Sequence, residues 1–538
     1  MKILLAVILL LIPRFGRTQP FTPMDSIRGG YGPERSCYDL NHYHLKLSVN
    51  PQTRFISGFS RLSGKALIPF KTLQVDLAEG FDIEKMITAN GEAKWKRKGN
   101  ALFVTLPKAL EKGEKFWLQI HYHGHPHVAE NAPWQGGFVW QTDTEGYPWV
   151  GVACEGEGSS SWFPSKDHPA DEPDSAFLQF EVPKNLTAVS NGRLLKKKAT
   201  SDSTHVFSYG VSYPINHYNI TLNVAAYSQW KDTMKLPDGQ VLNMSFYALP
   251  ADLEKAKVQF AQSKKVISTL SQLFGSYPFV RDGYTLVQTP YRGMEHQSCI
   301  AYGENFKDTP FGFDYIVMHE TGHEWWGNLI SCSDHADMWI HESFCTYSEA
   351  LFLERTQSKE IAINYLLKQK EKIKNKTPIQ GPHGIYYSGW EDYDMYYKGS
   401  WMLHSIRSML NDDNLWFDFL RKAGSEIGLK PISTSDIIQL ISKDLKRDLA
   451  PIFMAYLQSK NWPEVEWKIS IADGKPMLEY RWNVVNTEQK LGVEFVLDGK
   501  NVRLIPDVEW KSIAANSQKS ILESNERLNL IRTKKITP

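Results

Sequence analysis

The chain has 538 residues, with 61 lysines and arginines against 60 aspartates and glutamates, so its formal net charge at pH 7 is +1. This length is enough for three or four domains. Because the charge is balanced and no basic run exceeds Lys196-Lys197-Lys198, the composition gives no electrostatic case for a nucleic-acid partner, and we expect none.

The N-terminus resembles a secretory signal. Lys2 precedes an apolar run over residues 3–12, which is too short to span a bilayer. We expect residues 1–18 to be a signal peptide cleaved near Thr18 and the protein to be exported, to the periplasm or the extracellular space. Arg14 and Arg17 are atypical of such a signal, and the competing interpretation is an uncleaved N-terminal anchor. No later apolar segment is long enough for another membrane span.

Residues 19–235 show the period-two alternation of β-strands. Apolar side chains alternate with polar ones over residues 43–49 and 73–77, and the pattern returns at Leu222 and Val224. We expect an N-terminal antiparallel β domain.

Helical periodicity dominates residues 236–460. The apolar positions between Leu253 and Leu270 predict one amphipathic helix, and strands are expected around 284–287 and 299–302. Further helices are expected around 338–356, 399–410, 435–444 and 448–458, the third of them preceded by the N-cap candidates Ser433, Thr434 and Ser435.

Strands return after Trp462-Pro463. Asp473-Gly474 and Asp498-Gly499 each separate two alternating apolar runs, which is typical of a β-hairpin turn. We expect residues 461–538 to form a small β-sandwich.

The most informative segment is His319-Glu320-Thr321-Gly322-His323 in a predicted helix. Residues four apart lie on one helical face, so His319 and His323 can present two imidazoles to one metal ion. Two histidines and one carboxylate are a known ligand set of catalytic zinc, and Glu342 on the following predicted helix is the candidate third ligand. The alternative is a chance match on a surface helix.

These residues, together with Trp326, Asn328 and Trp339, resemble the zinc signature of the aminopeptidase N and leukotriene hydrolase family, the gluzincins. Three further segments match the family in the right order. Gly293-Met294-Glu295-His296 resembles its Gly-x-Met-Glu-Asn exopeptidase motif, and Tyr396-Tyr397-Lys398-Gly399 its Tyr-x-Lys-Gly motif. Cys154-Glu155 ahead of Pro164 and Asp167 resembles a segment that binds the substrate amine.

The resemblance implies a multidomain α+β fold with an N-terminal antiparallel β saddle and a thermolysin-like α/β zinc catalytic domain. The family often continues into a large C-terminal helical domain, but beyond the small C-terminal β-sandwich expected from the strand pattern we expect no such domain here. The resemblance also implies one Zn²⁺ per chain and peptide substrates with a free N-terminus. Glu320 would be the general base and Tyr396 the donor to the oxyanion. Glu295 and Glu155 would hold the α-ammonium group, beside Gly293 and Met294, although Glu157 lies close enough to be mistaken for Glu155.

The chain departs from the family pattern at several positions. Arg292 stands in place of the first glycine of the exopeptidase motif, and His296 in place of its asparagine. Ser160 replaces the arginine usually found four residues before the proline of the third segment. These departures put the backbone contacts to substrate in doubt, but they remove no ligand and no catalytic group.

Two other functions remain as alternatives. One is a zinc endopeptidase or epoxide hydrolase built on the same metal site. The other is a catalytically silent binding protein on an aminopeptidase scaffold, which the presence of every ligand and catalytic group disfavours. The histidines at 121, 123, 125 and 127 lack a carboxylate or cysteine to complete a ligand set. The odd number and wide spacing of the five cysteines do not indicate a disulfide framework, and one or two bridges remain open for an exported protein.

Overall fold

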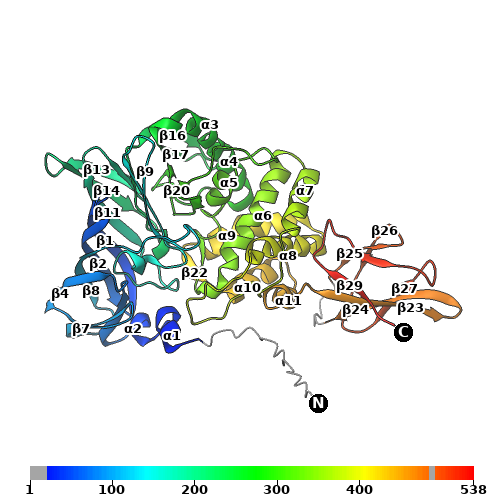
Figure 1. Cartoon of the computed structure of the whole chain (residues 1–538). Helices are drawn as coiled ribbons and strands as arrows, with labels where there is room; N and C mark the ends of the chain where they lie inside the picture. Colours follow the sequence, from blue (N-terminus) through cyan, green and yellow to red (C-terminus); the bar gives the residue numbers. More distant parts are fainter. Residues whose placement is uncertain (1–20, 484–490, 538) are drawn as a thin grey trace, which may run out of the picture.

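The computed structural model describes residues 21–483 and 491–537 (Figure 1). The expected signal peptide, residues 1–18, lies outside this part of the chain. Strands dominate the first 235 residues and helices the middle of the chain, and strands return at the C-terminal end. The expected mixed, multidomain architecture with a β-rich N-terminal part is confirmed.

An eight-stranded sheet forms the framework of the N-terminal part. Its central strands alternate buried and exposed side chains, so one face packs on a core and the other meets solvent. In spatial order the strands are β13 (Arg193–Ala199), β14 (Thr204–Val211), β11 (Ser175–Pro183), β1 (Tyr38–Asn50), β2 (Phe55–Ala66), β8 (Lys115–Gly124), β4 (Phe81–Thr88) and β5 (Gly91–Glu92).

Two smaller sheets lie in the same region of the chain. One contains β3 (Phe70–Asp76), β7 (Ala101–Leu110) and β6 (Lys94–Lys98). The other contains β12 (Thr187–Val189), β15 (Asn223–Ala225), β10 (Pro148–Ala153) and β9 (Gly137–Thr142). Since β10 ends two residues before Glu155, this sheet sets where that carboxylate can lie.

A five-stranded sheet begins the middle region of the chain. Its order is β16 (Ser228–Lys235), β17 (Val241–Ala248), β18 (Tyr284–Gln288), β20 (Cys299–Tyr302) and β19 (Gly293–Met294). The sequence puts residues 228–235 at the end of the N-terminal domain, yet β16 pairs along its whole length with β17. The chain therefore passes from the N-terminal sheets to the five-stranded sheet before Ser228.

Helices fill the centre of the molecule (Figure 1). They are α3 (Leu253–Phe260), α4 (Gln262–Phe274), α5 (Tyr315–Gly322), α6 (Trp339–Thr356), α7 (Lys359–Lys370), α8 (Asp394–Leu410), α9 (Asp413–Ile427), α10 (Thr434–Asp444) and α11 (Ala450–Leu457). The single helix expected over 253–270 is divided into α3 and α4 by one residue, Ala261, which itself keeps right-handed helical dihedral angles (φ −59°, ψ −23°). There the Ser263 hydroxyl donates to the Phe260 carbonyl at 2.6 Å, and Val258 lies 73% exposed.

The C-terminal strands form two sheets, to the right in Figure 1. One contains β27 (Lys511–Ala514), β24 (Lys475–Asn483), β23 (Glu464–Ala472) and β29 (Arg532–Lys535), and the other β26 (Lys500–Leu504), β25 (Val493–Leu497) and β28 (Leu522–Ser524). Both expected hairpin turns are present. Asp473 and Asp498 have positive φ, as do the glycines that follow them, which is the backbone of a tight two-residue turn.

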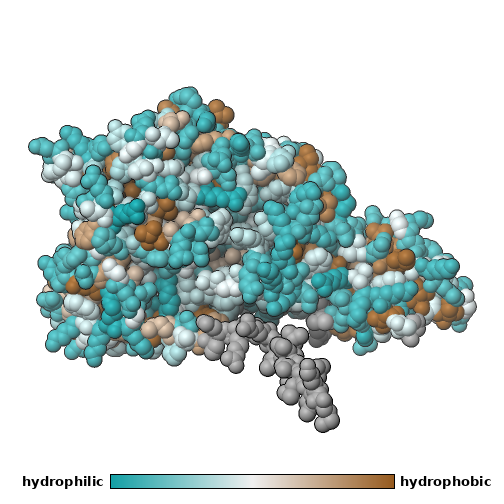
Figure 2. Space-filling model, viewed as in Figure 1, coloured by the Kyte–Doolittle hydropathy of each residue, from teal (hydrophilic) through white to brown (hydrophobic). Residues whose placement is uncertain are grey.

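None of the described helices is both long and apolar enough to cross a bilayer. On the face shown in Figure 2, hydrophobic residues form small scattered groups among hydrophilic ones.

The five cysteines are buried, and none of them forms a disulfide.

Helices α6 and α8 cross closely at a glycine. A Cβ added at Gly399 would lie 1.8 Å from the Ser343 hydroxyl oxygen, so the crossing requires a residue without a side chain. This contact fixes α8, which carries Tyr396 in its first turn, against α6, which carries Glu342.

We therefore expect Gly399→Ala to destabilise the protein by about 1–3 kcal/mol through overpacking. Thermal unfolding measures the effect. Gly32→Ala is the matched control, because the nearest atom to its added Cβ is the Glu34 carboxylate at 3.9 Å. Equal unfolding temperatures for the two variants would contradict the packing argument.

Candidate active site

Helix α5 begins at a capping aspartate. The Asp314 carboxylate accepts from the backbone N–H of Val317 at 2.9 Å, and also from Tyr302 and Gln259 at 2.8 Å. This fixes the start of a helix whose residues from Ile316 onward are buried. His319 and His323 follow one turn apart, with His323 at the C-cap and still in right-handed helical conformation.

A glycine lets α6 approach α5. A Cβ at Gly322 would lie 2.9 Å from the sulfur of Cys345 and 3.0 Å from the hydroxyl of Ser348, both on α6. The glycine that weakens the helix in isolation is thus what permits the close approach. As a result, Glu342 from the first turn of α6 faces both histidines.

Three electron-pair donors converge at this point. The Nε2 atoms of His319 and His323 lie 3.3 Å apart. Glu342 Oε2 lies 3.6 Å from the first of these atoms and 3.5 Å from the second. Ligand atoms about 2.0–2.1 Å from a tetrahedral ion are separated by roughly 3.3–3.4 Å. The spacing of the three atoms therefore suits a tetrahedral metal with one further position open.

The other nitrogen of each imidazole is held by the protein. His319 Nδ1 lies 2.7 Å from Glu349 Oε1, and His323 Nδ1 lies 2.8 Å from the carbonyl oxygen of Trp326. Both partners are acceptors, so the Nδ1 atoms carry the protons and the Nε2 lone pairs face inward. Carboxylate and carbonyl partners of this kind orient histidines that bind metals.

The donor set fits a divalent cation. Glu342 Oε2 is buried and has no hydrogen-bond partner among the described residues. A buried carboxylate facing two lone pairs is costly unless a cation neutralises it.

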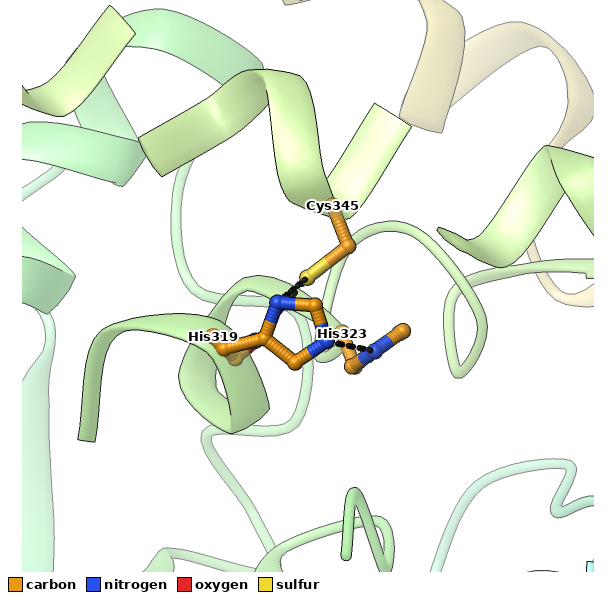
Figure 3. A group of neighbouring side chains, drawn as sticks. All are labelled: His319, His323 and Cys345. Atoms are coloured by element: carbon orange, nitrogen blue, oxygen red, sulfur yellow. Dashed lines mark hydrogen bonds between the residues drawn. The ribbon is translucent and has the colours of Figure 1, made fainter. Parts of the chain in front are cut away.

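Cys345 forms a second grouping with the two histidines, but its geometry differs (Figure 3). Its sulfur lies 3.8 Å from Nδ1 of His319, whereas His323 approaches Nε2 of that ring. The thiol donates to the His319 carbonyl at 2.9 Å. Cys345 therefore packs behind the imidazole and is not directed at the point where Glu342 converges.

Glu320 lies beside this centre in a cavity of about 220 Å³. A Cβ at Gly293 would lie 2.7 Å from Glu320 Oε1, so the glycine makes room for that carboxylate. Carboxylate oxygens of Glu320 and Glu295 and a nitrogen of His323 lie within 4.8 Å of one another. Burial raises the pKa of Glu320 to about 7, and a bound cation would oppose that rise.

Glu295 and Glu155 line the same cavity from different elements. Glu295 Oε1 accepts from the Tyr218 hydroxyl at 3.0 Å. Burial raises the pKa of Glu155, and the nearby carboxylate of Glu295 adds to this. Glu157 is held elsewhere, because its carboxylate accepts from the N–H of Gly136 at 2.6 Å. The cavity therefore receives Glu155 and not Glu157.

The remaining candidates also border the cavity. Gly293 and Met294 form edge strand β19, which pairs with β20 on one side only. Tyr396 lies with its ring nearly parallel to that of His319, their centroids 6.1 Å apart. It also lines an adjoining cavity of about 270 Å³ with Trp134, Trp390 and Glu155. All nine residues singled out in the sequence thus lie around one point.

Sequence reasoning missed two residues that hold this site. Glu349 lies seven residues beyond Glu342, on the same face of α6, and that helical spacing could have identified it. Tyr218 comes from the short helix η2 (His217–Asn219) in the N-terminal part of the chain. Nothing in its local sequence marks it, because its contact with Glu295 spans 77 residues.

The fold and the donor set define a metallopeptidase, and comparison with known proteins agrees. Residues 260–456 match the Peptidase family M1 domain, and residues 40–218 match the Peptidase M1 N-terminal domain. Leukotriene A-4 hydrolase of Xenopus laevis is 22% identical over 85% of this chain and 77% of that protein. Aminopeptidase B of Rattus norvegicus is 22% identical over 79% of this chain and 70% of that protein.

Solved structures share the fold. An M1 zinc metallopeptidase from Deinococcus radiodurans superposes with a TM-score of 0.67 at 22% identity, covering 79% of this chain and 94% of that one. The chain belongs to the M1 family of peptidases. It is a peptide-bond hydrolase, and its cofactor is zinc.

Removing a candidate ligand tests the centre. We expect Glu342→Ala to lose bound zinc, because it leaves two imidazoles to hold the ion. Metal analysis of purified protein measures this, with Cys345→Ala as the matched control on the same helix, which should keep one zinc per chain. Zinc lost from the Cys345 variant and retained by the Glu342 variant would contradict the assignment.

Proposed function

We propose that this protein is a zinc aminopeptidase that removes the N-terminal residue from peptides. The observation that carries the proposal is the pair of buried carboxylates, Glu295 and Glu155, beside the metal centre. Among the described residues, neither has a lysine or arginine partner. Two buried carboxylates without a cation suit the α-ammonium group, which distinguishes the N-terminal residue of a peptide from an internal one.

Distance from these carboxylates selects the bond that is cut. With the ammonium group held by Glu295 and Glu155, the first peptide bond lies against the metal centre and Glu320. An endopeptidase would have to place an uncharged internal segment against the same carboxylates, which gives no compensating charge pairing. The arrangement therefore favours exopeptidase over endopeptidase activity.

Glu320 is the proposed general base. When bound, zinc acidifies a coordinated water and polarises the carbonyl of the bond to be cut. Glu320 then takes the proton of the attacking water and passes it to the departing amine, a role that requires proximity but no bond to the metal.

Tyr396 and strand β19 are proposed to complete the site. Burial raises the pKa of Tyr396 well above its ordinary value, so the phenol keeps its proton and can donate to the developing oxyanion. The free edge at Gly293 and Met294 offers backbone groups to an extended peptide, as an added strand would use them. We further propose export of the protein, on the N-terminal sequence alone.

A matched pair of substrates tests the amine anchor. We expect a leucyl chromogenic amide to be hydrolysed and its N-acetyl derivative to be cleaved at least about a hundredfold more slowly, because acetylation removes the charge that Glu295 and Glu155 bind. Steady-state kcat/KM measures the ratio. Equal rates, or faster cleavage of the acetylated substrate, would overturn the aminopeptidase proposal.

A second experiment isolates the base. Glu320→Gln preserves size and should keep one zinc per chain, while kcat falls by about 10²–10⁴ because the amide cannot accept the proton. Metal analysis and kcat are measured on the same preparation. Substantial turnover by the zinc-replete variant would show that another group removes the proton.

A further inference from the structure

The segment before the first strand is anchored to the rest of the molecule. Helix α1 (Pro23–Gly29) begins with a capping box between Thr22 and Asp25. The Arg35 guanidinium donates to the carbonyls of Ile27, Arg28 and Gly30 at 2.8–3.0 Å and forms a fully buried ion pair with Asp76 at 2.7 Å. This segment lies ahead of the residues that match the N-terminal family domain, which begin at 40.

Arg28 reaches from this segment into the turn that carries Glu155. Its Nη1 forms an ion pair with Asp167 at 2.7 Å and donates to the Ser160 hydroxyl at 3.2 Å. Its Nη2 donates to the backbone carbonyl of Glu157, two residues beyond Glu155. A guanidinium is suited to this task, because its fixed fork of donors can hold several acceptors at once.

Arg28 also reaches Glu155 by a second route. Its guanidinium lies over the ring of Tyr386, 4.1 Å from the centroid, and the Tyr386 hydroxyl donates to the backbone carbonyl of Glu155 at 2.5 Å. The imidazole of His335 stacks with the same ring at 4.3 Å. The Tyr386 ring therefore packs against the Arg28 guanidinium and the His335 imidazole, while its hydroxyl is bonded to the Glu155 backbone.

The α1 segment packs tightly around two glycines. A Cβ at Gly158 would lie 2.2 Å from an Asp167 carboxylate oxygen and 2.6 Å from Arg28 Nη2. A Cβ at Gly29 would lie 1.9 Å from the backbone nitrogen of Tyr386. Both glycines permit close contact between α1, the Glu155 turn and the segment around Tyr386.

We propose that Arg28 is a positioning residue for Glu155, so that α1 determines how well the enzyme holds the substrate amine. The inference rests on the proposed role of Glu155 in binding that amine. Ser160 occupies the position where the sequence pattern expects an arginine, and Arg28 supplies a guanidinium to that hydroxyl from another part of the chain.

Two zinc-chelating inhibitors separate positioning from general damage. L-Leucine hydroxamate carries the α-amine, and 4-methylpentanohydroxamate is the same molecule without it. We expect Arg28→Ala to weaken binding of the amine-bearing compound by about tenfold and that of the other by less than about twofold, since a charge-assisted hydrogen bond is the interaction impaired. Arg61→Ala is the matched control, because Arg61, in strand β2, also bonds a polar side chain and lies over an aromatic ring.

A double-mutant cycle tests whether Arg28 acts through Glu155. If it does, adding Arg28→Ala to Glu155→Ala should give no further loss of amine discrimination. Additive losses, or equal weakening of both inhibitors by Arg28→Ala, would overturn the proposal. If Glu155→Ala itself leaves the discrimination unchanged, the amine anchor in the proposed function fails instead.

Arg28→Lys covers the case in which the alanine variant does not fold. Lysine keeps a cation for Asp167 but lacks the fork that also holds Ser160 and the Glu157 carbonyl. We expect it to fold and to lose part of the amine discrimination, with the second inhibitor bound as before. Full discrimination in a folded Arg28→Lys protein would reject the positioning role.

Discussion

The convergence of two imidazole lone pairs and one carboxylate oxygen on a single point is the constraint on which the rest of the structure depends. His319, His323 and Glu342 are buried, and together they are unfavourable unless a cation lies between them. Their approach requires α5 and α6 to pack closely, which Gly322 permits, and requires each ring to be turned inward by Glu349 or by the Trp326 carbonyl. The close packing of α5 and α6 and the polar contacts to the two imidazoles together bring the three donor atoms to one point.

The groups that surround this centre come from distant parts of the chain. Glu155 follows a strand of the N-terminal region, Glu295 follows the edge strand of the five-stranded sheet, and Tyr396 begins α8. Because no single element carries all three, their arrangement around the cavity depends on how the N-terminal strands pack against the helical region. Contacts such as that between Tyr218 and Glu295, and that between Tyr386 and the Glu155 backbone, fix this relationship.

Sequence reasoning named His319 and His323 as candidate ligands because helical periodicity is local, so that two histidines four apart must share a face. The structure places their Nε2 atoms 3.3 Å apart. Family motifs extended the prediction to Glu295, Tyr396 and Glu155. Local sequence could not predict Tyr218 or Arg28, whose partners lie 77 and 139 residues away and depend on tertiary packing. The division at Ala261 was missed for a different reason, since a side-chain bond from Ser263 competes with a helical pattern that periodicity alone favours. The sequence also could not show that β16 belongs to the five-stranded sheet, because alternation identifies a strand but not the sheet in which it pairs.

Anomalous diffraction at the zinc edge, from crystals of the zinc-loaded protein, tests the central claim most directly. The account predicts one peak per chain, within about 2.0–2.2 Å of Nε2 of His319, Nε2 of His323 and a carboxylate oxygen of Glu342. A peak bonded to the sulfur of Cys345 at about 2.3 Å, or one that excludes Glu342, would contradict it.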